Sequence, residues 1–210
     1  MIYPKVTADE FKCEIIRKIL EERKEIVIGN ECCCGRSRKV VDLVTIENKK
    51  VIVGYEIKSD SDNFIRLYEQ IEQYKKVFDY VVLVVGARHR EKGLEFCSKQ
   101  PSLGCWCLNE NGIEIVRRGK KYRNTDKMEM LYTMSTKYLR QVCQNVKNLS
   151  ADDMRRGLCK KSKEEIHRLL VGYMNMRYGG SFELFLKEDG LNFTQDDLST
   201  LTGAFEVVLK

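Results

Sequence analysis

One stretch of the sequence constrains the fold more than any other, the nearly continuous apolar run DYVVLVVG at residues 79–86. A strand that is apolar on both faces is typical of a sheet covered by helices on both sides, and it favours parallel pairing. Before it, residues 63–78 place Phe64, Leu67, Ile71 and Tyr74 at spacings of three and four, after the segment SDSDN, which is rich in N-capping residue types. This pattern predicts a helix leading into the strand, and therefore an α/β protein.

The segments around this unit extend the same architecture. From residue 7, TADEFKCEIIRKILEER has apolar residues at helical spacing, and Thr7 and Glu10 occupy the positions of a capping box. Three β-branched runs follow, EIVIG, KVVDLVTI and KVIVGYEIK, at residues 25–29, 39–46 and 50–58. They predict consecutive strands, of which the last two form a hairpin, while GCWCL and GIEIVR predict two short strands after the central one.

The character of the chain changes beyond about Gly119, where helix-forming residues dominate and β-branched runs are few. We expect a core at residues 1–119 and a mainly helical extension at residues 120–210. Residues 120–210 hold 16 Lys and Arg against 12 Asp and Glu, so they carry +4 of the net charge of +6. This mildly basic balance is compatible with a nucleic-acid partner but does not require one.

Two features of the composition bear on the cellular setting. Nine cysteines in a chain of 210 residues without a signal-peptide pattern predict reduced thiols and a cytoplasmic protein rather than a disulfide scaffold. No run approaches the roughly 18 apolar residues needed to cross a bilayer, so we expect no membrane association.

Three charged residues lie in the predicted hairpin. Asp42 interrupts a β-branched run, where a carboxylate is costly to bury unless it is paired or binds a cation. Glu56 and Lys58 lie two apart on the next strand and so share a face. Carboxylate oxygens are preferred ligands of Mg²⁺ and Mn²⁺, and the backbone carbonyl of Ile57 is a natural third ligand. Lys58 can orient or deprotonate the attacking water and neutralise charge on a phosphate, so the trio predicts metal-dependent phosphodiester hydrolysis.

The pattern D-x(13)-E-x-K, followed by Gln70-x-x-x-Tyr74 on the next helix, resembles the PD-(D/E)XK nuclease superfamily. The stretch GYEIKSDSDNFIRLYEQIEQYKKVFDYVVLVVGARH is similar to a small bacterial and phage branch of it, and the resemblance covers residues 7–116. It implies a restriction-endonuclease-like fold with a central mixed sheet flanked by helices, and Mg²⁺ or Mn²⁺ as cofactor. By residue, it implies metal ligation by Asp42 and Glu56, a catalytic Lys58, and support from Gln70 with Tyr74 beside it.

The resemblance also implies a further acid, and the sequence offers three candidates. Glu31 is favoured because its position at the end of a strand lets it reach Asp42, whereas Glu10 has a capping role and Glu14 fits a solvated helix face. The proline that commonly precedes the first aspartate is replaced by Val41, a position that varies in such families.

Plainer interpretations compete with several of these assignments. Taken alone, an E-x-K on a strand is an ordinary surface ion pair, and Gln70 and Tyr74 are ordinary helix residues. The cysteines lack the paired spacing of a zinc site, and the basic run RRGLCKKSK either follows a nucleic-acid backbone or forms a solvated face. We therefore predict a nuclease acting on DNA in preference to RNA, with a homodimer as a compatible assembly. The alternative is a catalytically silent nucleic-acid-binding or regulatory protein on the same fold.

Overall fold

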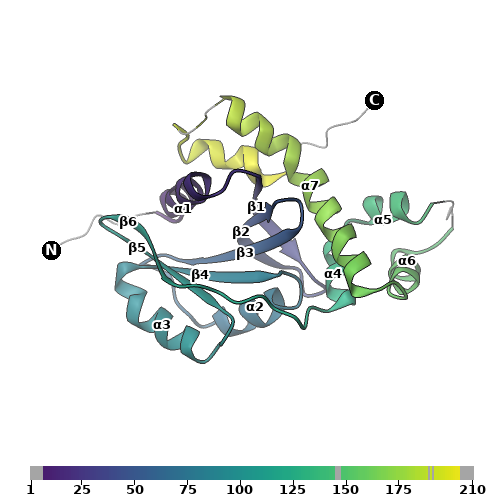
Figure 1. The fold of residues 1–210 in the computed structure, drawn as a ribbon, viewed down its shortest axis with the longest axis horizontal. Helices are drawn as coiled ribbons and strands as arrows, with labels where there is room; N and C mark the ends of the chain where they lie inside the picture. The colour runs from purple at the N-terminus through teal and green to yellow at the C-terminus, as the bar shows by residue number, and fades with distance from the viewer. Residues whose placement is uncertain (1–6, 145–147, 189, 191, 204–210) are drawn as a thin grey trace.

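The computed structural model describes residues 7–144, 148–188, 190 and 192–203. Within them a six-stranded sheet has helices against both faces, with α1 on one side and α2 and α3 on the other (Figure 1). The elements are α1 (Ala8–Glu22), β1 (Ile26–Cys34), β2 (Lys39–Glu47), β3 (Val51–Lys58), α2 (Leu67–Tyr74), β4 (Tyr80–Gly86), η1 (Ala87–His89), α3 (Arg90–Ser98), β5 (Gly104–Asn109), β6 (Gly112–Arg117), α4 (Lys127–Thr133), α5 (Thr136–Val142), α6 (Ala151–Leu158), α7 (Lys163–Glu188) and η2 (Asp196–Thr202).

The strands follow one another across the sheet in chain order, β1 to β6. The first three pair antiparallel, β4 lies parallel to β3 and β5 parallel to β4, and β6 returns antiparallel. The predicted α/β class, with a mixed central sheet flanked by helices and a helical C-terminal part, is confirmed. So is the parallel placement of the apolar run 79–86 beside the hairpin.

Side chains on the two faces of the sheet form two separate cores. We call them the α1-side core and the α2-side core after the helix that covers each. The α1-side core includes Ile15, Ile19, Ile28, Leu43, Tyr55, Val84 and Trp106. The α2-side core includes Val44, Ile46, Ile52, Ile71, Tyr74, Leu83 and Met130.

Helix α7 contributes to both cores. Its residues up to Tyr178 pack into the α2-side core, while Phe182 and Phe185 pack into the α1-side core together with η2. The change of side occurs at β1, where the Tyr178 ring lies so close to Gly29 that an added Cβ would approach its Cδ1 to 2.5 Å. The C-terminal helices thus continue both cores of the sheet.

Two helices differ from the sequence expectation. The helix expected over residues 63–78 is shorter, and its N-cap Arg66 makes no side-chain capping bond. The capping residue types upstream serve the preceding loop, because the Asp62 carboxylate accepts hydrogen bonds from the Ser59 amide and hydroxyl. Helix α3 was not predicted; its sequence REKGLEFCS has little apolar periodicity and contains Gly93, which packs against Val85 of β4.

One further local expectation is confirmed. The capping box of Thr7 and Glu10 opens α1. None of the helices in the described part of the chain is long and apolar enough to span a membrane. The ends of the two predicted regions, residues 1–6 and 204–210, lie outside the described residues.

Candidate active site

Glu56 and Lys58 lie at the end of β3, and both side chains meet residues of α2. Glu56 is 1% exposed, yet both of its carboxylate oxygens have partners. Oε1 lies 2.5 Å from the Lys58 Nζ, and Oε2 accepts a hydrogen bond of 2.9 Å from the Tyr74 hydroxyl. Glu56 and Lys58 are therefore in contact on one face of β3, as their spacing predicts, and the pair is largely enclosed by protein rather than solvated.

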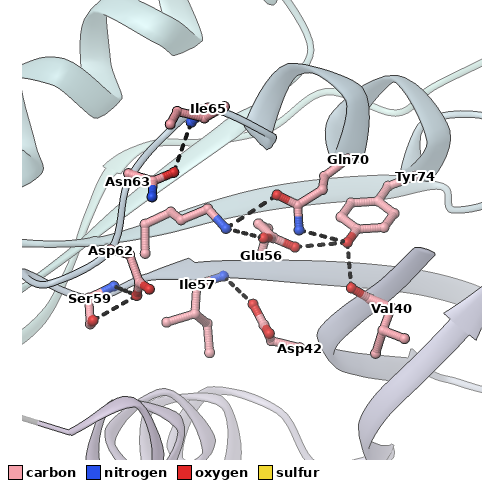
Figure 2. Close-up of polar contacts among 11 residues, drawn as sticks. Val40, Asp42, Glu56, Ile57, Ser59, Asp62, Asn63, Ile65, Gln70 and Tyr74 are labelled. Carbon is pink, nitrogen blue, oxygen red and sulfur yellow. Dashed lines mark hydrogen bonds and ion pairs between the residues drawn. The ribbon is translucent and has the colours of Figure 1, made fainter.

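Gln70 and Tyr74, one turn apart on α2, complete this cluster (Figure 2). The Lys58 Nζ donates to the Gln70 Oε1 at 3.3 Å, and the Gln70 Nε2 makes a long contact of 3.5 Å with the Tyr74 hydroxyl. The same hydroxyl lies 2.6 Å from the Val40 carbonyl oxygen. A phenol has one proton, so it can donate to only one of its two acceptors, Val40 or Glu56, at a time.

Asp42 reaches the cluster through the backbone of β3. Its Oδ2 accepts a hydrogen bond of 2.7 Å from the Ile57 amide (Figure 2). The ladder between β2 and β3 ends at the pair of Leu43 and Tyr55, so the carboxylate binds a strand amide that no β2 carbonyl reaches. Because the N–H and C=O of a residue in a strand point to the same neighbour, the Ile57 carbonyl faces this gap as well.

A switch of faces in β1 and β2 explains the position of Asp42. Val41 packs into the α2-side core and Leu43 into the α1-side core, although residues two apart in a strand share a face. The switch coincides with Glu31 of β1, which has a positive φ of 56°. Its neighbours Asn30 and Cys32 each pair with a residue of β2. A left-handed backbone is unfavourable for a residue with a Cβ, and such strain is common at functional sites.

Both carboxyl groups have raised pKa values. The pKa of Glu56 is raised to about 7, first by burial and then by the charge of Asp42, against the opposing effects of Lys58 and Tyr74. Burial also raises the pKa of Asp42, although the Ile57 amide, Lys58 and Lys12 oppose the change. Two acids that resist ionisation together form a site that a cation would stabilise.

The three candidates for a further acid have different surroundings. Glu10 binds the Thr7 amide at 2.6 Å in the capping box, and Glu14 pairs with Arg17 at 2.5 Å on the same helix. Glu31 has a side chain that is 55% exposed and lies 3.4 Å from the Lys12 Nζ. Its place in the strand is next to Asp42, but the ion pair directs its carboxylate toward α1.

Lys12 is a neighbour of the site that sequence analysis missed. It is 7% exposed, its Nζ lies 2.9 Å from the Asn30 Oδ1, and its charge lowers the pKa of Asp42. A signal was available, because Lys12 precedes Ile16 and Ile19 by four and seven residues and so lies on the apolar face of α1. Asp62 also raises the pKa of Asp42, although its residue type and position in SDSDN predict only a helix cap.

The site offers two carboxylate ligands for a hard divalent cation. Asp42 and Glu56 supply two carboxylates, and Mg²⁺ is commonly held by one or two carboxylates together with water and substrate phosphates. Across the described residues, no three His, Cys, Asp or Glu side chains converge as a metal cluster. A third protein ligand would therefore be a backbone oxygen, as expected for Ile57.

Comparison with known proteins gives one family and one solved structure. The family model described as bacteriophage P4 protein cII matches residues 5–202. A solved structure titled SPO1766 protein of unknown function from Silicibacter pomeroyi is 15% identical, with a TM-score of 0.44, covering 71% of this chain and 98% of that one. No curated protein matches the chain. A structural similarity of this size carries no information on function.

Proposed function

The chain belongs to the bacteriophage P4 protein cII family, and because that description states no activity, we propose from the site itself that the protein is a metal-dependent nuclease of the PD-(D/E)XK type. The observation that carries the proposal is the pairing of half-buried Asp42 with buried Glu56 beside Lys58, where the charge of Asp42 helps to raise the pKa of Glu56. We infer DNA as the substrate in preference to RNA.

In this proposal each side chain has a defined task. A bound Mg²⁺ or Mn²⁺ would polarise the scissile phosphoryl group and lower the pKa of a coordinated water. Asp42 and Glu56 would hold the ion, with the Ile57 carbonyl as the third protein ligand. Lys58 would place the attacking water and neutralise charge that develops on the phosphate.

Gln70 and Tyr74 would hold Lys58 and Glu56 in position. The Gln70 Oε1 holds the Lys58 ammonium at 3.3 Å, and the Tyr74 hydroxyl holds the Glu56 carboxylate at 2.9 Å. Both come from α2, so the helix fixes Lys58 and Glu56 relative to each other. Glu31 is proposed as the further acid, which requires its carboxylate to leave Lys12.

One observation favours the second candidate, a catalytically silent nucleic-acid-binding or regulatory protein. Both oxygens of Glu56 already have protein partners, Lys58 and Tyr74, so the site is satisfied without a cation. In the nuclease proposal a divalent ion must displace the Lys58 ammonium from the carboxylate. The two candidates therefore differ in whether Mn²⁺ binds.

The deciding experiment combines cleavage with metal binding. Linear, circular and branched DNA and a matched RNA are incubated with the protein in Mg²⁺ or Mn²⁺, and Mn²⁺ binding is measured by calorimetry. We expect DNA cleavage by the wild type and a loss of about 10²- to 10⁴-fold for Lys58→Met, the range typical of a lost proton-transfer group. Glu56→Gln should lose both cleavage and Mn²⁺ binding.

Lys99→Met serves as the matched control, because Lys99 is an exposed lysine at the end of α3 that pairs with Glu95 and has no contact with the cluster among the described residues. It should cleave as the wild type does. Equal cleavage by Lys58→Met and wild type would reject the assignment of the site. Nucleic-acid binding without Mn²⁺ binding or cleavage would establish the silent alternative.

A further inference from the structure

A second site lies at the opposite end of β3 from Glu56. A cavity of about 700 Å³ is formed by the turn between β2 and β3, the start of β4, the segment after β6 and the first turns of α7. Its volume is in the range of small-molecule sites. Four residues, about 13 Å of strand, separate Glu56 from Ile52, whose amide binds the cavity residue Asp79. The cavity is therefore distinct from the candidate active site.

The cavity concentrates positive charge. Six cationic residues and two carboxylates line it, a net charge of +4 out of +6 for the whole chain. Four of the six form no side-chain hydrogen bond or ion pair with any residue that the structure describes. Unpaired cations around a hollow attract an anionic ligand. The six are Lys49, Lys50, Lys121, Arg123, Lys163 and Arg168.

A buried carboxylate organises the wall of the cavity. Asp79 is 3% exposed and accepts hydrogen bonds from the Ile52 amide at 2.9 Å and from the Lys121 Nζ at 3.0 Å. Its Oδ2 also lies 2.7 Å from the His167 Nε2. These three contacts offset the negative charge of the Asp79 carboxylate, so that it repels an anion in the cavity less. They also fix Lys121 and His167 in place. Tyr122 and Val171 add apolar surface beside them.

The turn that carries Lys49 is strained. Asn48 and Lys49 have positive φ values of 49° and 53°, and the Lys50 amide binds the Glu47 carbonyl at 3.0 Å. A turn with two left-handed residues strongly prefers Asn-Gly, so a lysine at the second position is unfavourable for the backbone. Strain that persists where glycine would relieve it points to a role for the side chain, here a cation that lines the cavity.

We propose that this cavity binds the phosphoryl groups of a small ligand of the nucleoside polyphosphate class. The cations match two or three adjacent phosphoryl groups, because lysine and arginine are the side chains that recognise phosphate. The Tyr122 and Val171 surface accommodates the less polar part of the ligand. The site is independent of the proposed nuclease activity, since it shares no residue with the cluster around Glu56.

The test measures binding of adenosine triphosphate by calorimetry in EDTA and about 0.15 M salt, conditions that exclude metal-dependent cleavage. Adenosine, inorganic triphosphate and a short single-stranded oligonucleotide are measured separately. We expect adenosine triphosphate to bind, inorganic triphosphate to bind more weakly and adenosine not to bind. Arg168→Gln and Lys49→Gly should each weaken binding by about five- to tenfold, a typical effect of removing one charged contact.

Lys49→Gly separates binding from folding, because it removes the cation while relieving the backbone, so its unfolding midpoint should not fall. Arg38→Gly is the matched control: Arg38 also has a positive φ of 56° in a hairpin turn but does not line the cavity. It should bind as the wild type does. Absence of adenosine triphosphate binding, unchanged affinity in both cavity variants, or binding of the oligonucleotide alone would overturn the proposal.

Discussion

Glu56 is buried where water cannot hydrate its charge, and its pKa is raised to about 7. An unfolded chain releases this proton near the ordinary pKa of a glutamate, so between about pH 4.5 and 7 the folded state binds more protons. The unfolding free energy contributed by Glu56 therefore falls as the pH rises through this window, on the order of 1–3 kcal/mol. Between pH 5 and 8 we therefore expect the unfolding free energy of Glu56→Gln to fall less than that of the wild type, by the amount that Glu56 contributes.

Urea unfolding at both pH values, in EDTA, measures this difference. In a separate measurement at pH 8 with Mn²⁺ in place of EDTA, stability should be restored to the wild type and not to Glu56→Gln, because an ion bound only by the folded state stabilises it. Parallel stability curves for the two proteins across the window would contradict the assigned pKa shift.

The hydroxyl of Tyr74 differs from that of Tyr122 in its partners. Tyr74 contacts the Val40 carbonyl and the Glu56 carboxylate, whereas the Tyr122 hydroxyl is buried without a hydrogen-bond partner among the described residues. Removing a donor from buried acceptors costs about 1–3 kcal/mol, while removing an unpaired buried hydroxyl does not. Tyr74→Phe should therefore lower the urea midpoint, and Tyr122→Phe should leave it unchanged or raise it. Equal effects would show that the Tyr74 contacts contribute nothing to stability.

At the level of elements, the packing of α7 on β1 depends on the absence of a side chain at residue 29. A Cβ there would approach the buried Tyr178 ring to 2.5 Å, so Gly29→Ala should destabilise the protein by about 1–3 kcal/mol, as overpacking does. The same change at Gly179, inside α7, where an added Cβ meets no described atom within 4 Å apart from its chain neighbours and the helix's own backbone, should stabilise by about 0.5–1 kcal/mol. Thermal unfolding of both variants gives the signs, and a stable Gly29→Ala would place α7 elsewhere.

How far the sequence predicts an element depends on whether the determining interactions are local. The strand at β4 and the capping box of α1 follow from patterns within a few residues, and both are confirmed. The beginning of α2 does not follow from such a local pattern. Asp62 and Ser59 bond to each other in a loop, although their residue types also suit a helix cap. Local competition of this kind is invisible in a list of residue types.

The candidate site shows the same limit. The spacing of Glu56 and Lys58 predicts their shared face, and their contact is present. The position of Asp42 depends on the switch of faces beside Glu31, a backbone event that no periodicity indicates. Lys12 reaches the site from α1, 30 residues before Asp42; its place on the apolar face of α1 indicates burial, but only the packing of the helix shows that it lies beside Asp42.

At the scale of the whole molecule, residues 1–119 and residues 120–210 both contribute side chains to the two cores. This arrangement predicts whether the first part can fold alone. Phe182, Phe185 and Phe193 are buried with α1 in the α1-side core, and α4 and α7 supply residues to the α2-side core. A fragment of residues 1–119 would expose the surfaces that these residues cover. Since the free energy of folding is a small difference between large terms, we expect this fragment to lack cooperative unfolding.

Trp106, the one tryptophan of the chain, reports this directly because its ring lies 5.3 Å from Tyr55 within the α1-side core. In the full chain its fluorescence should change in one sharp transition with urea, and in residues 1–119 alone the change should be gradual. Adding residues 120–210 as a second fragment should restore the sharp transition, because the missing side chains return to both cores. A sharp transition in residues 1–119 alone would instead establish an independent domain and leave the helical part as an accessory that acts on substrate choice.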